Sequence, residues 1–118
     1  MTRIDQSSLQ KLLELIGNDN AALAELIDSF LIEAPALVDT LEQAETKNDL
    51  ESMRRAAHTL KSSARDFGAL DLGEYCAALE AQCKASEVVD APGQIARITQ
   101  EFDSVRTELK SIVSTLGQ

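Results

Sequence analysis

The chain has 118 residues, of which 44% are hydrophobic and 3% aromatic, and its 11 basic and 20 acidic side chains give a formal net charge of −9. This length suits one core, so residues 1–118 are predicted to form a single domain. The acidic excess argues against a nucleic-acid binder, which needs a basic footprint, and against docking on anionic lipid. Only two prolines and five glycines interrupt a sequence rich in Leu and Ala. We therefore expect an all-helical protein.

The sequence shows none of the marks of secreted, membrane-spanning or metal-binding chains. Its first residues have no signal-peptide pattern, and no apolar stretch is long enough to cross a bilayer, so we expect a cytoplasmic protein. Cys76 and Cys83 are seven residues apart, which on a helix separates their Cα atoms by about 10 Å, beyond the reach of a disulfide. We expect both cysteines to be buried as small hydrophobic residues. One histidine and two cysteines without close spacing predict no metal site.

Helix start and stop signals divide the chain into five or six predicted segments. The first runs from about residue 7 to residue 16, and the second starts near Asp19. Proline removes a backbone donor and clashes with the preceding turn. Pro35 therefore predicts a kink or short break near residues 33–34. Because the apolar rhythm continues beyond it, we expect a third segment over residues 35–46 that roughly continues the second.

The fourth predicted segment contains the histidine. Residues 48–51 read Asn-Asp-Leu-Glu, the pattern of a capping box with Asn48 as the N-terminal cap. Gly68 is predicted to end this helix. Two further helices follow, one over about residues 70–84 and a last one with Pro92 in its first turn. Because each long helix has one apolar stripe, we expect an up-and-down antiparallel four-helix bundle with a short N-terminal helix packed across it.

His58 is predicted to lie on the exposed side of its helix. At about 100° per residue, it is more than a quarter turn from the centre of the predicted core stripe. Lys61, Ser62 and Arg65 follow His58 at i+3, i+4 and i+7 and therefore share its face. An unprotonated imidazole nitrogen can attack phosphorus, and an adjacent ammonium group can offset the charge of phosphoryl oxygens. The same spacing also fits an ordinary solvated helix face. The core stripe is predicted to contain Met53, Ala57, Leu60 and Ala64.

Residues 57–69 read AHTLKSSARDFGA, which resembles the signature of histidine-containing phosphotransfer domains of two-component phosphorelay systems. That signature combines a His-x-x-Lys core, small residues, and an ending of an apolar residue, Gly and a small residue. Residues 30–35 and 72–80 resemble the helices on either side, so the resemblance covers about residues 9–115. This sequence departs from the family at Ser62, where Gly is most frequent.

The resemblance implies a phosphorelay intermediate, a phosphocarrier without kinase activity of its own. His58 would accept a phosphoryl group from a receiver-domain aspartate and pass it to another receiver, and Lys61 would stabilise that group. The implied partners are response-regulator receiver domains and a hybrid sensor kinase, and the receiver would supply Mg²⁺, with no cofactor on this chain. We expect a monomer. The residues implied in partner binding are Ser62, Ser63, Arg65, Gly68, Ile32, Leu12 and Ile16, although ordinary core packing also explains the last three.

Two other functions compete with this interpretation. A helical docking module would bind a receiver domain without taking phosphate, and His58 would then be dispensable. The phosphoacceptor region of a histidine kinase typically has an acidic residue after the histidine and a Thr-Pro pair nearby. Thr59 follows His58 instead and no proline is close, which disfavours that class.

Overall fold

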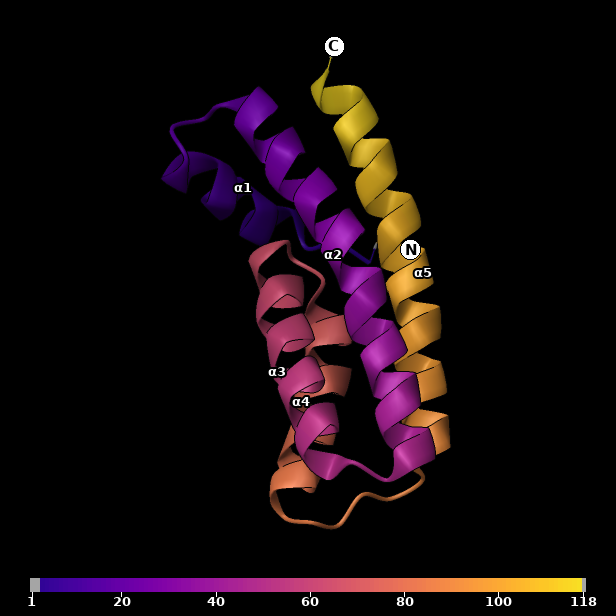
Figure 1. Ribbon diagram of the computed structural model, residues 1–118. Coiled ribbons are helices and arrows are strands. Elements are labelled where there is room, and N and C mark those ends of the chain that lie inside the picture. Colours follow the sequence, from indigo (N-terminus) through magenta and orange to yellow (C-terminus); the bar gives the residue numbers. More distant parts are fainter. Residues whose placement is uncertain (1–2, 118) are drawn as a thin grey trace.

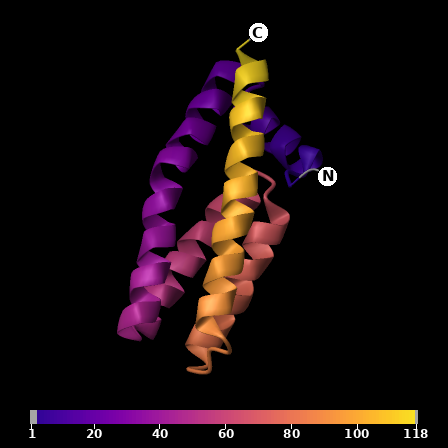
Figure 2. The same cartoon turned by 90° about the vertical axis from the view of Figure 1, so that its right-hand side faces the viewer.

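The computed structural model describes residues 3–117, and these form five helices. Helices α2 to α5 run alternately up and down as a bundle, and α1 lies across one end (Figures 1 and 2). The helices α2 and α5, of 28 and 26 residues, extend beyond α3 and α4, of 17 and 15 residues. In the space left above the end of α3, α1 packs against the bundle. The bounds are Gln6–Leu15 for α1, Asn20–Lys47 for α2, Leu50–Asp66 for α3, Leu70–Lys84 for α4 and Ala91–Leu116 for α5.

Four of these helices begin after an aspartate whose carboxylate accepts a hydrogen bond from a backbone N–H three residues on. The predicted cap at Asn48 is wrong. Asn48 instead ends α2 in the left-handed conformation, with φ 55°, and Asp49 caps α3. Only two residues join the two helices, and asparagine tolerates positive φ better than most residues, so each of the two serves a different helix. The capping residues are Asp5, Asp19, Asp49 and Asp90.

Helix α2 runs without interruption through Pro35. The short break predicted at residues 33–34 is therefore wrong, whereas residues 35–46 do continue the second segment as expected. Buried side chains recur at helical spacing on both sides of the proline, including Ala34 and Val38. A continuous helix keeps this whole stripe in the core, and that packing outweighs the backbone hydrogen bond that proline removes.

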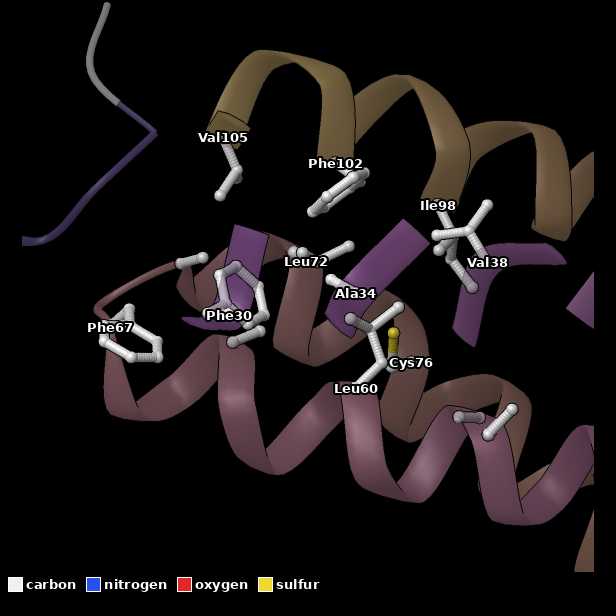
Figure 3. Close-up of a cluster of buried hydrophobic side chains, with 14 of the residues drawn as sticks. Phe30, Ala34, Val38, Leu60, Phe67, Leu72, Cys76, Ile98, Phe102 and Val105 are labelled. Carbon is white, nitrogen blue, oxygen red and sulfur yellow. The ribbon is translucent and has the colours of Figure 1, made fainter. Parts of the chain in front are cut away.

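The core is built around the three phenylalanines (Figure 3). The ring of Phe30 in α2 lies 5.1 Å from that of Phe67 and 6.1 Å from that of Phe102, measured between centroids. Cys76 of α4 is buried in the same cluster, and both it and Cys83 are free thiols, as predicted. The predicted stripe of α3 is confirmed as well, because Met53, Ala57, Leu60 and Ala64 are each at most 1% exposed.

The N-terminal segment, residues 3–5, crosses from α5 to the turn between α3 and α4. The backbone N–H of Arg3 donates to Glu108 Oε1 of α5 at 2.6 Å, and the backbone N–H of Asp5 donates to the carbonyl of Gly68 at 2.8 Å. Ile4 between them is 1% exposed. Gly68 has φ 80° and ends α3 as predicted, and a Cβ there would lie 2.6 Å from the carbonyl oxygen of Asp5.

Candidate functional site

His58 lies in the middle of α3 on the flank that faces α4, and its side chain is 55% exposed. The predicted exposed position is therefore confirmed. Its Nδ1 atom lies 2.8 Å from Oε2 of Glu80, which belongs to α4. The helices α3 and α4 run side by side (Figure 2), so this contact joins two residues 22 positions apart in the sequence.

Glu80 is a buried carboxylate, with a side chain that is 5% exposed. Lys61 Nζ donates to Glu80 Oε1 at 2.6 Å, and Lys84 Nζ lies 3.4 Å from Glu80 Oε2. The hydrogen bond from Lys61, helped by the contact with His58, lowers the pKa of Glu80 to about 2, although burial opposes that change. Glu80 is therefore ionised at neutral pH, and its charge is balanced by the basic side chains around it.

The charge of Glu80 determines which nitrogen of His58 carries the proton. An ionised carboxylate can only accept hydrogen bonds, so the Nδ1 atom facing it must be protonated. In the neutral ring the lone pair is then on Nε2, the nitrogen that does not contact Glu80. The arrangement leaves a nucleophilic nitrogen on a side chain that is more than half exposed.

Local packing explains how α3 and α4 present these groups. Ala57 and Leu60 are completely buried, which fixes the helix on either side of His58. On α4, Leu79 is completely buried and Glu80 follows it on the flank toward α3. The two helices approach closely at Gly73, where a Cβ would lie 3.0 Å from Cγ of Arg65. Glycine at this position lets the Arg65 side chain lie against α4.

The structure brings only some of the predicted site residues together. Lys61 shares Glu80 with His58, while Ser62 and Arg65 are exposed and Ser63 is half-buried along the same helix. Gly68 is buried beneath Asp5, so its conformation and packing account for it without a partner.

The three predicted rim residues differ in their surroundings. Leu12 and Ile16 are partly buried and pack against the core. Ile32 is 78% exposed. It is two residues from the buried Phe30 and Ala34, which on a helix directs it away from the bundle. In addition, a groove between α2 and α3 is lined by Leu37, Thr40 and Thr59, and neither His58 nor Glu80 lines it.

Glu80 is a site residue that the sequence pattern did not indicate. It is four residues after Cys76 and three before Cys83, both predicted to point inward, so a charged residue was present at the edge of an apolar stripe. A buried carboxylate needs a partner. The spacing of Glu80 from the two cysteines was therefore the one sign in the sequence that it could be a buried, paired residue. The sequence did not indicate which helix would supply the partner.

Two further findings concern residues 3–117. In that range no group of three or more His, Cys, Asp or Glu side chains is arranged to hold a metal ion. The same range contains no helix that is long and apolar enough to cross a membrane.

Comparison with known proteins identifies the class of protein. Residues 25–108, which include both His58 and Glu80, match the family described as the Hpt domain. The chain is 33% identical over 85 residues to the phosphorelay protein LuxU of Vibrio harveyi, covering 72% of this chain and 73% of LuxU. It is also 34% identical over 79 residues to the sensor protein TorS of Escherichia coli K12, covering 67% of this chain and 8% of TorS.

Solved structures agree with this assignment. The histidine-containing phosphotransfer protein HptB of Pseudomonas aeruginosa PAO1 superposes with a TM-score of 0.87 and 26% identity, over 96% of both chains. The HPT domain of a sensor hybrid histidine kinase from Shewanella has the same fold, with a TM-score of 0.80, 20% identity and coverage of 98% and 97%. The chain therefore belongs to the Hpt domain family. It is a phosphocarrier of two-component phosphorelays that relays phosphoryl groups with receiver domains.

Proposed function

We propose that His58 carries the phosphoryl group on Nε2, accepting it from the aspartyl phosphate of one receiver domain and passing it to the aspartate of another. The observation that supports this most directly is the contact between His58 Nδ1 and Glu80 Oε2 at 2.8 Å. It holds the ring by one nitrogen and leaves the other, on the exposed side chain, available to a visiting protein.

The transfer needs no base on this chain. The Nε2 lone pair forms the new N–P bond while the P–O bond to the receiver aspartate breaks, and the aspartate leaves as a carboxylate with the electron pair of that bond. The Nδ1 proton stays in place, so the phosphorylated ring carries a positive charge. Glu80 faces that charge directly and stabilises it, in the way that a buried carboxylate stabilises an imidazolium in other histidine chemistry. In the reverse step the same charge makes the ring a good leaving group.

The surroundings of His58 suit an acidic partner. Although the whole chain has a net charge of −9, the α3–α4 face around His58 carries Lys61, Arg65 and Lys84. These charges attract the phosphoryl group and the carboxylates that hold Mg²⁺ in a receiver site. We propose that the receiver supplies the Mg²⁺ and that this chain binds no cofactor.

Ser62 is exposed and Ser63 is half-buried on the same helix as His58, and we propose that they line the docking surface. The first phosphoryl group would come from a hybrid sensor kinase through its receiver domain. We further propose that the protein acts as a cytoplasmic monomer, a location that fits its two unpaired thiols, Cys76 and Cys83.

The proposal is tested by incubating the protein with a phosphorylated receiver domain and Mg²⁺. Acid-labile, base-stable phosphate is expected on the wild type and on a Glu74→Gln control, in which an exposed residue of α4 is changed. No label is expected on His58→Gln. Label that persists on His58→Gln would show that another residue carries the phosphate. Receiver binding without any label on the wild type would favour the docking-module alternative.

A further inference from the structure

Two lysines contact Glu80, and they do so very differently. Lys61 Nζ lies 2.6 Å from Oε1, whereas Lys84 Nζ lies 3.4 Å from Oε2. The side chain of Lys61 is 19% exposed and that of Lys84 is 60% exposed. We infer that Lys84, and not Lys61, is the lysine that moves to the phosphoryl group on His58, while Lys61 stays on Glu80. The inference rests on the proposed phosphorylation of His58.

Moving Lys61 away from Glu80 costs a large amount of free energy. Its contact with Glu80 is a short, charge-assisted hydrogen bond between a mostly buried ammonium group and a carboxylate that is 5% exposed. If Lys61 turned outward to the phosphoryl group, Oε1 of Glu80 would lose its donor inside the protein. Removing one partner from a buried ion pair costs much more free energy than opening an exposed ion pair, because it leaves a buried charge without a partner. Lys61 therefore acts through Glu80 as a positioning residue for the ring.

Lys84 can leave Glu80 at little cost. Its separation from Oε2 is longer than a good hydrogen bond. The Lys84 side chain is 60% exposed, so water can solvate its ammonium group when this i,i+4 contact opens. Lys84 contacts the same oxygen as His58 Nδ1, so its ammonium group is within two hydrogen-bond lengths of the ring. A flexible four-carbon side chain can cover the remaining distance to a group on Nε2.

The other cations on this face are less suitable. Arg54 is held by Glu51, with Nε 3.2 Å from Oε2 of that residue. Arg65 is seven residues after His58, which places it about 10 Å further along α3. Lys84 is thus the exposed cation that already contacts Glu80, the residue that accepts the hydrogen bond of the His58 ring.

The change on phosphorylation follows from these contacts. The phosphoryl group brings two negative charges next to Nε2, and the mobile cation moves toward them. Glu80 keeps Lys61 and the proton on Nδ1, so the ring keeps its orientation while its charge changes. Lys61 thus holds the carboxylate of Glu80 in place, and Lys84 neutralises the phosphoryl group.

The direct test is NMR of the wild-type protein, with the ε-CH₂ and Nζ signals of its lysines followed before and after loading with potassium phosphoramidate. Phosphorylation is expected to shift the signals of Lys84 strongly and those of Lys61 little, with Lys110, an exposed residue of α5, as an unaffected reference. A large shift at Lys61 with little change at Lys84 overturns the inference. A wild-type protein that takes phosphate from neither phosphoramidate nor a phosphorylated receiver overturns the proposed function as well.

A second measurement uses the equilibrium between phosphorylated receiver and phosphorylated protein. Lys84→Met is expected to lower the equilibrium constant for phosphoryl transfer from the receiver to this protein by about fivefold. That factor is the upper end of what an exposed ion pair contributes. Lys84→Arg keeps the charge and should restore it to within about twofold, and Lys110→Met should leave it unchanged. Salt at about 1 M should remove most of the difference, because it screens exposed charges. An unchanged equilibrium in Lys84→Met at low salt contradicts the inference.

Discussion

Glu80 on α4 accepts the hydrogen bond of His58 Nδ1 on α3 from a side chain that is 5% exposed. The orientation of the reactive ring thus depends on a residue of another helix and on the packing of α3 against α4. A histidine alone on a helix surface would rotate freely and would present either nitrogen. The buried carboxylate selects one tautomer and one ring position at once.

Replacing Glu80 by Gln should slow phosphorylation of His58 by roughly tenfold. Glutamine has nearly the same shape but no charge, and a charge-assisted hydrogen bond exceeds a neutral one by about 1 to 1.5 kcal/mol. The rate of phosphate transfer from a phosphorylated receiver measures the effect. Glu74→Gln, on the exposed side of the same helix, should transfer at the wild-type rate. If both variants transfer at that rate, the carboxylate has no part in the reaction.

The stability that Glu80 contributes should depend on pH. In the folded protein its pKa is lowered from 4.5 to about 2, chiefly by the hydrogen bond from Lys61. The folded state therefore holds its proton more weakly than the unfolded chain does. The stabilisation is complete above about pH 4.5 and is lost as pH falls toward 2.

Urea unfolding of the wild type and of Glu80→Gln measures this contribution. The wild type should exceed the variant in free energy of unfolding at pH 6, and the difference should shrink steadily between pH 4.5 and pH 2. The comparison between the two proteins cancels the pH dependence that other carboxylates contribute. One of these is Asp49, whose pKa is also lowered by its hydrogen bond with Ser52. If the difference in free energy of unfolding is the same at both ends of this range, the contacts of Glu80 do not lower its pKa in the folded protein.

The exposed position of His58 and the core stripe beneath it were predictable because both follow from the periodicity of a single helix. The role of Glu80 was not, since it depends on how two helices face each other. Its neighbours Leu79 and Cys83 are buried, and sequence periodicity alone does not tell a charged edge residue from a solvated one. The fold class needed only local patterns, whereas the site needed the packing of α3 against α4.

The errors at helix ends have the same origin. Asn48 and Asp49 are both good capping residues, and the choice between them depends on the direction in which the chain must turn after α2. Pro35 is a reliable local signal for a break, but local signals weigh only a few kcal/mol. A long stripe of buried residues on both sides of it provides more than that, which the sequence does not quantify.

Pro35→Ala should therefore stabilise the protein. Alanine restores the backbone donor and removes the ring clash in the middle of α2, and the expected gain in free energy of unfolding is about 1 kcal/mol after the greater flexibility of the unfolded chain is counted. The control is Ala36→Gly at the next, exposed position, which should destabilise by about 1 kcal/mol. Thermal unfolding measures both. A lower melting temperature for Pro35→Ala would show that the proline fits its site without cost.

Two glycines with the same backbone conformation offer a further test, because Gly17 and Gly68 both have φ 80°. Alanine at either position carries the cost of a left-handed backbone, about 1 kcal/mol. Their surroundings differ. A Cβ at Gly17 would meet no atom within 4 Å, whereas a Cβ at Gly68 would lie 2.6 Å from the carbonyl oxygen and 3.2 Å from the nitrogen of Asp5. The second substitution must push residues 3–5 away from the end of α3.

Gly17→Ala should accordingly lower the free energy of unfolding by about 1 kcal/mol, and Gly68→Ala by at least about 2 to 3 kcal/mol. Denaturant unfolding of the two variants measures the difference, which isolates the contact with Asp5 from the shared backbone strain. The folded fraction of Gly68→Ala should still phosphorylate at His58, since Gly68 is ten residues along the chain and does not touch the Glu80 contacts. Equal destabilisation of the two variants would mean that the N-terminal segment yields without cost.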